Sequence, residues 1–111
     1  MNLWLDDVRD PAKHGRIGWT WAKTAAEAVA YLRTGQVEKA SLDHDLAWEH
    51  YPWNDTGEPY KEPTGYMVVC WMEEMNIWPP GGVICHSANP VGRARMQKVV
   101  DAHYNDATVS R

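Results

Sequence analysis

Polar residues that could carry out chemistry lie in three short clusters, and each cluster directly follows an apolar run. The clusters are Asp6-Asp7, Asp43-His44-Asp45 and His86-Ser87-Ala88-Asn89. Carboxylate oxygens bind divalent cations such as Mg²⁺, and an imidazole exchanges its proton near neutral pH. If the fold brought the clusters together, the carboxylates would repel one another unless a proton or a cation neutralised some of them. The residue types therefore indicate a metal-assisted or acid–base site, provided that the clusters converge.

Each cluster also has a simpler structural explanation. An Asp-Asp pair after a strand often forms a turn, and Asp43 or Asp45 could cap a turn or a helix. His86 could be a buried histidine whose hydrogen bonds are satisfied. Asn89 is followed by a proline, a combination that favours a helix N-cap. Convergence of all the clusters would favour a functional site over these separate explanations.

The apolar runs predict short β-strands. The predicted strands are residues 2–5, 19–22, 37–42 and 82–85. The first, third and fourth end at the polar clusters, while the second alternates polar and apolar residues as a half-buried strand does. Three of the predicted strands therefore deliver polar residues at their carboxyl ends.

Helices are expected between and after these strands. The first begins at Thr24, which opens a capping box, and Gly35 ends it. Apolar residues with helical spacing predict a second helix between residues 64 and 78, before a pair of prolines. A third helix is expected to begin at Pro90, and residues 105–111 are expected to form a frayed tail.

Strands that alternate with helices predict a single α/β domain, residues 1–111, with a mostly parallel sheet. In such sheets ligands bind outside the carboxyl ends of the strands, which is where the clusters lie. The N-terminus of the third helix could bind an anion, with Arg93 and Arg95 adding positive charge. Residues 46–63 have no apolar period and are expected to form a long loop that is functional or mobile.

Composition restricts the partners. The net charge of -4 argues against binding of long nucleic acids, whereas a small anionic ligand held by a metal or by local arginines is compatible with it. The apolar runs are too short to cross a membrane and no signal peptide is recognisable, so we expect a cytoplasmic protein. Cys70 and Cys85 lie in apolar runs and are expected to be reduced, buried thiols. The oligomeric state is left open.

Aromatic residues are concentrated in the long loop. The chain contains seven tryptophans and no phenylalanine, and Trp48 and Trp53 lie in this loop beside tyrosines. These rings could stack on a nucleobase or a ribose, or they could simply pin the loop to the domain. Both alternatives are open from the sequence.

Four strings of residues occur in order along the chain: LDDVRDP, SLDHDL, PTGYMVVCWM and HSANPVGRARM. Together they resemble the cyclic-phosphate processing receiver-like domain family, over Leu5 to about Val100. This family is a compact relative of the response-regulator receiver. The resemblance implies a small receiver-like (flavodoxin-like) α/β fold, a three-layer sandwich with a four-stranded, mostly parallel sheet.

The resemblance implies action on a small cyclic nucleotide or on the cyclic phosphate end of an RNA. Our leading hypothesis is a metal-assisted phosphodiesterase that opens the cyclic phosphate. The expected ligands of a Mg²⁺ or Mn²⁺ ion are Asp6, Asp7 and Asp43. The expected catalytic residues are His44, His86 and Asp45. The expected substrate- and phosphate-binding residues are Ser87, Asn89, Arg93, Arg95 and Trp48.

Alternatives remain at this point. One is a non-catalytic binder or sensor of cyclic nucleotides, and another is a degenerate receiver with Asp43 or Asp45 as phosphoacceptor. The chain lacks the fifth strand and the lysine with which receivers read phosphorylation, and it adds His44 and His86, so signalling is less favoured. Neither the choice of acid and base nor the role of Asp45, which could orient His44 or cap the turn, follows from the sequence.

Overall fold

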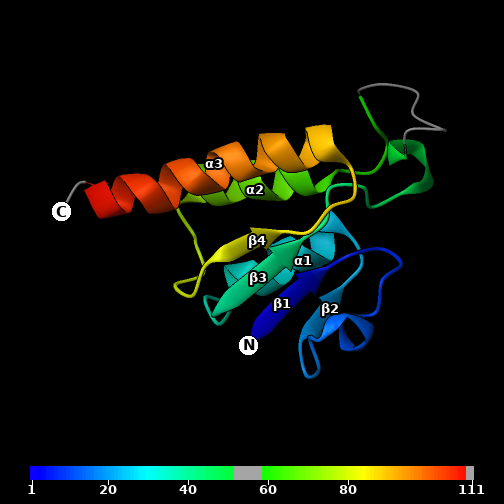
Figure 1. Cartoon of the computed structure of the whole chain (residues 1–111), viewed down its shortest axis with the longest axis horizontal. Helices are drawn as coiled ribbons and strands as arrows, with labels where there is room; N and C mark the ends of the chain where they lie inside the picture. Colours follow the sequence, from blue (N-terminus) through cyan, green and yellow to red (C-terminus); the bar gives the residue numbers. More distant parts are fainter. Residues whose placement is uncertain (52–58, 110–111) are drawn as a thin grey trace.

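The computed structural model describes residues 1–51 and 59–109. For residues 106–109 it describes the backbone alone. Its sheet contains the strands β1 (Asn2–Leu5), β2 (Thr20–Ala22), β3 (Lys39–Leu42) and β4 (Val83–Cys85). The strands lie in the order β2-β1-β3-β4, and every neighbouring pair is parallel (Figure 1). The predicted α/β fold with a four-stranded parallel sheet is confirmed.

Alternation along the strands separates the two faces of the sheet. Leu3, Leu5 and Leu42 are fully buried and belong to the main hydrophobic core with residues of the helices. Trp4 pairs with Ser41 in the register of β1 and β3, so these two side chains share the opposite face. Burial of each large apolar side chain stabilises the fold by about 1.5–3 kcal/mol. One face of the sheet thus holds the core together, and the other face is available to position polar groups.

Helix α1 (Ala25–Arg33) begins where the sequence predicts. The side chain of Thr24 accepts a hydrogen bond from the backbone N–H of Glu27 at 3.1 Å, as the capping box requires. The helix ends at Thr34, and Gly35 follows with a φ of 74°, a conformation that favours glycine. The predicted first helix is confirmed at both ends.

Helix α2 (Gly65–Met75) begins directly against the end of β3. The backbone N–H of Gly65 donates to the carbonyl oxygen of His44 at 2.9 Å. A Cβ at position 65 would overlap the carbonyl oxygen of Asp43, so only glycine permits this approach. The helix ends at Asn76, which is left-handed with a φ of 53°, a little before the predicted end at residue 78.

Helix α3 (Pro90–Val109) has the predicted N-cap, because the side-chain oxygen of Asn89 accepts the N–H of Gly92 at 3.0 Å. Its backbone stays helical to Val109, whereas the sequence predicts fraying from residue 105. No glycine or proline follows Gly92, so nothing in the local sequence ends the helix earlier. Within the described part of the chain, none of the helices combines the length and the apolarity that a membrane span requires.

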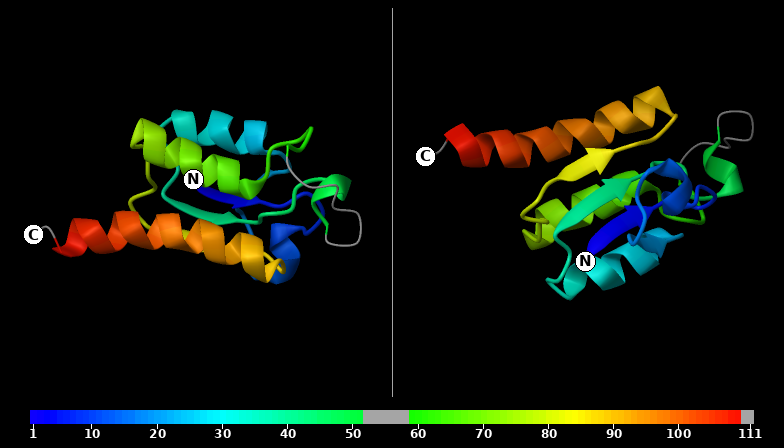
Figure 2. Two further views of the ribbon diagram at one scale, coloured as in Figure 1. Left: turned by 90° about the horizontal axis from the view of Figure 1, so that it is seen from above. Right: turned by 60° about the horizontal axis from the view of Figure 1, so that its bottom comes forward.

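The sheet is flanked on both sides (Figure 2). Helices α1 and α2 lie on one side, and α3 runs along the outer edge of β4, where it packs against α2 as well as the strand. On the other side, the chain between β1 and β2 returns over the sheet through the short 3-10 helix η1 (Pro11–His14). The ring of His14 stacks on the ring of Trp4 with centroids 5.8 Å apart, which covers this part of the face.

The described ends of the long 46–63 segment are joined to each other. The ring of His50, at the end of the 3-10 helix η2 (Trp48–His50), accepts the N–H of Leu46 at 2.9 Å and lies 2.7 Å from the carbonyl oxygen of Glu62. The carboxylate of Glu49 accepts two further backbone N–H groups from residues 61–62. These bonds hold η2 at the carboxyl edge of the sheet. Trp53 lies outside the described residues.

Replacing Gly65 by alanine tests the close approach of α2 to β3. Helix propensity alone predicts that Gly65→Ala stabilises the protein by about 1 kcal/mol. Because the new Cβ would overlap the backbone of Asp43, we expect a loss of about 2 kcal/mol or more in the free energy of unfolding. Urea unfolding measures the difference, with the exposed Met67→Ala in the same helix as control. A Gly65→Ala variant as stable as the parent would contradict this packing.

Candidate functional site

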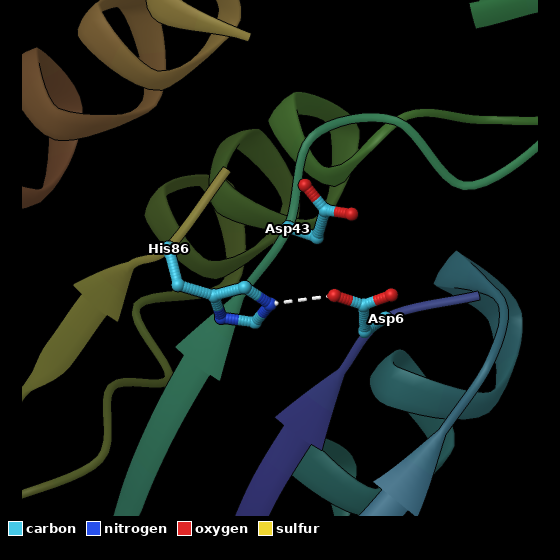
Figure 3. A group of neighbouring side chains, drawn as sticks. All are labelled: Asp6, Asp43 and His86. Atoms are coloured by element: carbon cyan, nitrogen blue, oxygen red, sulfur yellow. Dashed lines mark hydrogen bonds and ion pairs between the residues drawn. The ribbon is translucent and has the colours of Figure 1, made fainter. Parts of the chain in front are cut away.

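The three strand ends bring Asp6, Asp43 and His86 together (Figure 3). Each residue offers a carboxylate oxygen or a ring nitrogen, and these atoms all lie within 4.8 Å of one another. Asp6 is fully buried and Asp43 is 4% exposed. The cluster arises because β1, β3 and β4 are parallel, so the residues that follow them meet at one edge.

His86 is held from three directions. Its Nδ1 lies 2.7 Å from the hydroxyl of Ser41, and its Nε2 lies 3.0 Å from a carboxylate oxygen of Asp6. Its ring stacks on the ring of Trp4 with centroids 4.0 Å apart and planes 8° from parallel. Trp4 also donates from its indole N–H to the carbonyl oxygen of Arg9 at 2.8 Å. The face of the sheet opposite the main core therefore fixes the imidazole in the cluster.

The two carboxyl groups of the cluster have opposite electrostatic environments. Burial alone would raise the pKa of Asp6, but hydrogen bonds from His86 and from the backbone N–H groups of Arg9 and Val8 outweigh it and lower that pKa. Burial, together with repulsion from Asp6, raises the pKa of Asp43 to about 6. Hydrogen bonds from Ser87 and the backbone of His44 only partly offset this rise. Asp43 is therefore the group that most needs a proton or a cation.

The cluster fits a divalent cation. Two buried carboxylates with an imidazole within 4.8 Å are oxygen and nitrogen donors of the kind that bind such ions. An ion would relieve the repulsion that raises the pKa of Asp43. The Nε2 of His86 now faces Asp6 in a hydrogen bond, so an ion that used this nitrogen would displace a proton.

Asp7, a predicted metal ligand, lies apart from this group. Its carboxylate accepts the hydroxyl of Tyr51 through both oxygens, at 3.1 and 3.0 Å. Burial raises the pKa of Asp7, although the bond from Tyr51 opposes that rise. The structure thus separates the adjacent acids, with Asp6 in the cluster and Asp7 holding an aromatic side chain.

Asp45 orients His44. The Nδ1 of His44 lies 2.7 Å from a carboxylate oxygen of Asp45, and the same oxygen accepts the side-chain amide of Asn89 at 3.1 Å. The ring of His44 packs against α3 at Gly92, where a Cβ would lie 2.6 Å from the ring Nδ1. Both residues of the pair are buried. Of the two roles considered from the sequence, orientation of His44 is the one observed.

A cavity of about 210 Å³ adjoins the cluster. Its lining residues are Val8, Arg9, Asp43, Asp45, Tyr51, Ser87, Ala88, Asn89 and Pro90. The guanidinium of Arg9 lies 3.7 Å from Asp6, and its side chain is 38% exposed. The cavity therefore places a guanidinium cation, two hydroxyl groups and two carboxylates around one space. Neither His44 nor His86 is among its lining residues.

Three of the predicted substrate-binding residues lie elsewhere. Arg95 lies over the ring of Tyr66, 4.2 Å from its centroid, and lines a separate cavity of about 330 Å³. Arg93 is exposed on α3 and does not line the cavity beside the cluster. Trp48 is 70% exposed, with its ring centroid 6.4 Å from that of Tyr51. Ser87 and Asn89, by contrast, line the cavity beside the cluster.

Sequence reasoning missed Arg9 and Tyr51. Arg9 had a signal, because it follows the first strand by a few residues and so stays at the same edge of the sheet. Tyr51 had none, since it comes from a segment without periodicity and is placed by the bonds of η2.

The comparison with protein families agrees with this geometry. The model of the cyclic-phosphate processing receiver domain matches residues 1–102. The chain belongs to that family. The match includes all the strands, the cluster and the described residues that line the cavity. The resemblance inferred from the four sequence strings is thus confirmed. No curated protein and no solved structure matches the chain.

Stability should depend on pH through Asp43. Its pKa in the folded protein is about 6, above the ordinary value of 3.8, so the folded state keeps a proton that the unfolded chain releases between these values. Its contribution to stability is complete below about pH 4 and is lost as the pH rises through about 6. We expect Asp43→Asn to be more stable than the parent at about pH 7.5, with the difference vanishing near pH 4.

Thermal unfolding across this pH range, with and without Mn²⁺, measures both effects. Mn²⁺ should raise the Tm of the parent more at about pH 7.5 than at about pH 5, because protons compete for its ligands, and it should not raise the Tm of Asp43→Asn. Glu73→Gln, which removes an exposed carboxylate from α2, is the control. Identical pH profiles for the parent and Asp43→Asn would exclude the electrostatic role of Asp43.

Proposed function

We propose that the protein is a metal-assisted phosphodiesterase that opens cyclic phosphates, either in cyclic nucleotides or at the 2′,3′-cyclic phosphate ends of RNA. One observation carries the proposal: Asp43, which forms a cluster with Asp6 and His86, lines a cavity that is also lined by Arg9 and Ser87. Negative ligands for a cation thus lie beside a positive group for phosphate. Membership of a family named for cyclic-phosphate processing supports the substrate class.

The cluster would hold the cation. When bound, a divalent ion polarises a phosphoryl oxygen and lowers the pKa of bound water. Asp6 and Asp43 would be carboxylate ligands of this ion. The contacts of His86 with Ser41 and Trp4 keep the imidazole of His86 close to the two carboxylates. Mg²⁺ and Mn²⁺ both suit a site dominated by carboxylates.

Arg9 is the residue best placed to bind the phosphate. Its guanidinium borders the cavity beside Asp6, where it can donate charge-assisted hydrogen bonds to phosphate oxygens. Ser87 adds a hydroxyl from the loop that follows β4. The side chain of Asn89 is engaged with Asp45 and Gly92, so it supports the site and does not contact phosphate. Arg9 therefore takes the role for which the sequence favours Arg93 and Arg95.

The pair of Asp45 and His44 would transfer the proton. Asp45 lines the cavity, and His44 hydrogen bonds to its carboxylate from behind. In the reaction the water oxygen forms a bond to phosphorus and one ring P–O bond breaks. The pair takes the proton from the attacking water and releases it to solvent, and the departing alkoxide, which leaves on the opposite side of phosphorus, takes a proton from solvent water.

A phosphoacceptor receiver is the second candidate, because Asp43 lies at the end of β3 beside Asp6 in a member of a receiver family. Against it, the cavity is lined by no lysine among the described residues. Incubation with acetyl phosphate, followed by intact mass measurement, distinguishes the candidates. A stable gain in mass that is lost in Asp43→Asn would favour the receiver.

Turnover tests the proposal directly. We expect hydrolysis of nucleoside 2′,3′-cyclic phosphates with Mg²⁺ or Mn²⁺, followed by chromatography of the monoester products. Asp45→Asn should lower kcat by about 100-fold or more because it removes the proton acceptor. Arg9→Gln should raise KM and lower kcat/KM by about 10-fold or more. Arg93→Gln removes an arginine that does not line the cavity and serves as the matched control.

Binding separates an enzyme from a sensor. Calorimetry that detects a cyclic nucleotide bound at the cavity, while no cyclic phosphate is turned over with either metal, would replace the phosphodiesterase by a non-catalytic binder. Equal losses of activity in Arg9→Gln and Arg93→Gln would instead remove Arg9 from its assigned role.

A further inference from the structure

The cavity beside the cluster is lined by polar and by apolar residues. The polar residues include the groups already assigned to the phosphate and the proton. The remaining group, the apolar lining, consists of Val8, Tyr51, Ala88 and Pro90. The phosphate chemistry gives the apolar lining no task. Among the described residues that line the cavity, Tyr51 is the only aromatic one.

The volume of the cavity limits what it encloses. At about 210 Å³ it is smaller than the roughly 300–1,000 Å³ that enclose a drug-sized ligand. It has room for a cyclic phosphate and part of its sugar. The remainder of a nucleotide would have to lie along the rim, and the apolar lining is the part of the described surface that is not already assigned to the phosphate or the proton.

Tyr51 is fixed in position. Its hydroxyl donates to both carboxylate oxygens of Asp7, and its backbone follows η2, which His50 anchors to Leu46. Burial and the bond to Asp7 raise the pKa of Tyr51 well above its ordinary value, so it remains a neutral donor. The hydroxyl serves to hold the ring and is not available for proton transfer.

We propose that the ring of Tyr51, positioned by Asp7, is the surface on which the nucleoside part of the substrate lies. This inference rests on the proposed function and narrows its substrate class to cyclic phosphates that carry a nucleobase. A single aromatic face with apolar neighbours contacts the flat face of a base and not its hydrogen-bonding edge. The site therefore distinguishes the presence of a base from its absence and accepts different bases similarly.

Stacking of a base on an aromatic ring changes affinity by about 5- to 150-fold. We therefore expect kcat/KM for adenosine 2′,3′-cyclic phosphate to exceed that for glycerol 1,2-cyclic phosphate, which has the same reacting ring and no base, by a factor in this range. The kcat/KM values for the corresponding uridine and guanosine 2′,3′-cyclic phosphates should lie within about 10-fold of the value for the adenosine substrate. The ratio of kcat/KM between adenosine and glycerol substrates is the nucleoside preference.

Variants assign this preference to Tyr51. Tyr51→Ala should lower kcat/KM much more for the adenosine substrate than for the glycerol substrate and so abolish the preference, and Tyr51→Phe should retain a part of it. Asp7→Ala should reduce the preference and Asp7→Asn, which keeps an acceptor for the tyrosine hydroxyl, should preserve most of it. A general structural defect would lower kcat/KM equally for both substrates and leave their ratio unchanged. The proposal would be overturned if Tyr51→Ala kept the nucleoside preference of the parent. It would also be overturned if Trp48→Ala lost the preference and Tyr51→Ala did not.

A binding measurement keeps the inference testable if the enzymatic function fails. Calorimetry of the parent with Mn²⁺ compares adenosine 3′-monophosphate with glycerol 3-phosphate. Tighter binding of the nucleotide by at least about 5-fold, lost in Tyr51→Ala, supports the ring surface even when nothing is hydrolysed. Equal affinities of the two compounds for the parent protein would reject the inference, whether or not any variant folds.

Discussion

The structure depends on two carboxylates that the parallel pairing of β1 and β3 forces together. Leu5 pairs with Leu42 in the register of the strands, so the next residues, Asp6 and Asp43, lie side by side at the edge. Both are buried, and repulsion from Asp6 contributes to the raised pKa of Asp43. A fold selected only for stability would gain by replacing one of them, because buried like charges oppose folding. The stability that the protein loses by burying both carboxylates is therefore a physical argument that the pair serves a function.

The surroundings offset this cost unequally. Asp6 receives hydrogen bonds from two backbone N–H groups and from His86, whereas Asp43 receives one backbone bond and the hydroxyl of Ser87. A bound cation would neutralise the remaining negative charge, because it attracts both carboxylates. The same imbalance explains why protons and metal would compete: each relieves the one repulsion at Asp43.

Much of this arrangement could be predicted from the sequence, because it follows from strand order. Apolar runs located the strands, and parallel pairing places the polar residues that follow them at one edge. What could not be predicted depends on the direction of individual side chains. Asp6 continues the ladder, since its N–H donates to Ala22, and consecutive extended residues point to opposite sides. Only one acid of the Asp6-Asp7 pair can therefore join the cluster, and the sequence pattern does not say which.

Helix geometry explains the arginines in the same way. Arg93 and Arg95 lie in the first turns of α3, as expected, but successive helical residues point about 100° apart, so proximity to the N-terminus does not aim a side chain at the site. Gly92 occupies the inward position, where the ring of His44 fills the space that a side chain would take. Because the helix face turned towards the site is already filled, positive charge has to come from another element. Arg9, from the loop after β1, supplies this positive charge. The arginine proposed to bind phosphate thus lies on the same segment as Asp6, a proposed metal ligand.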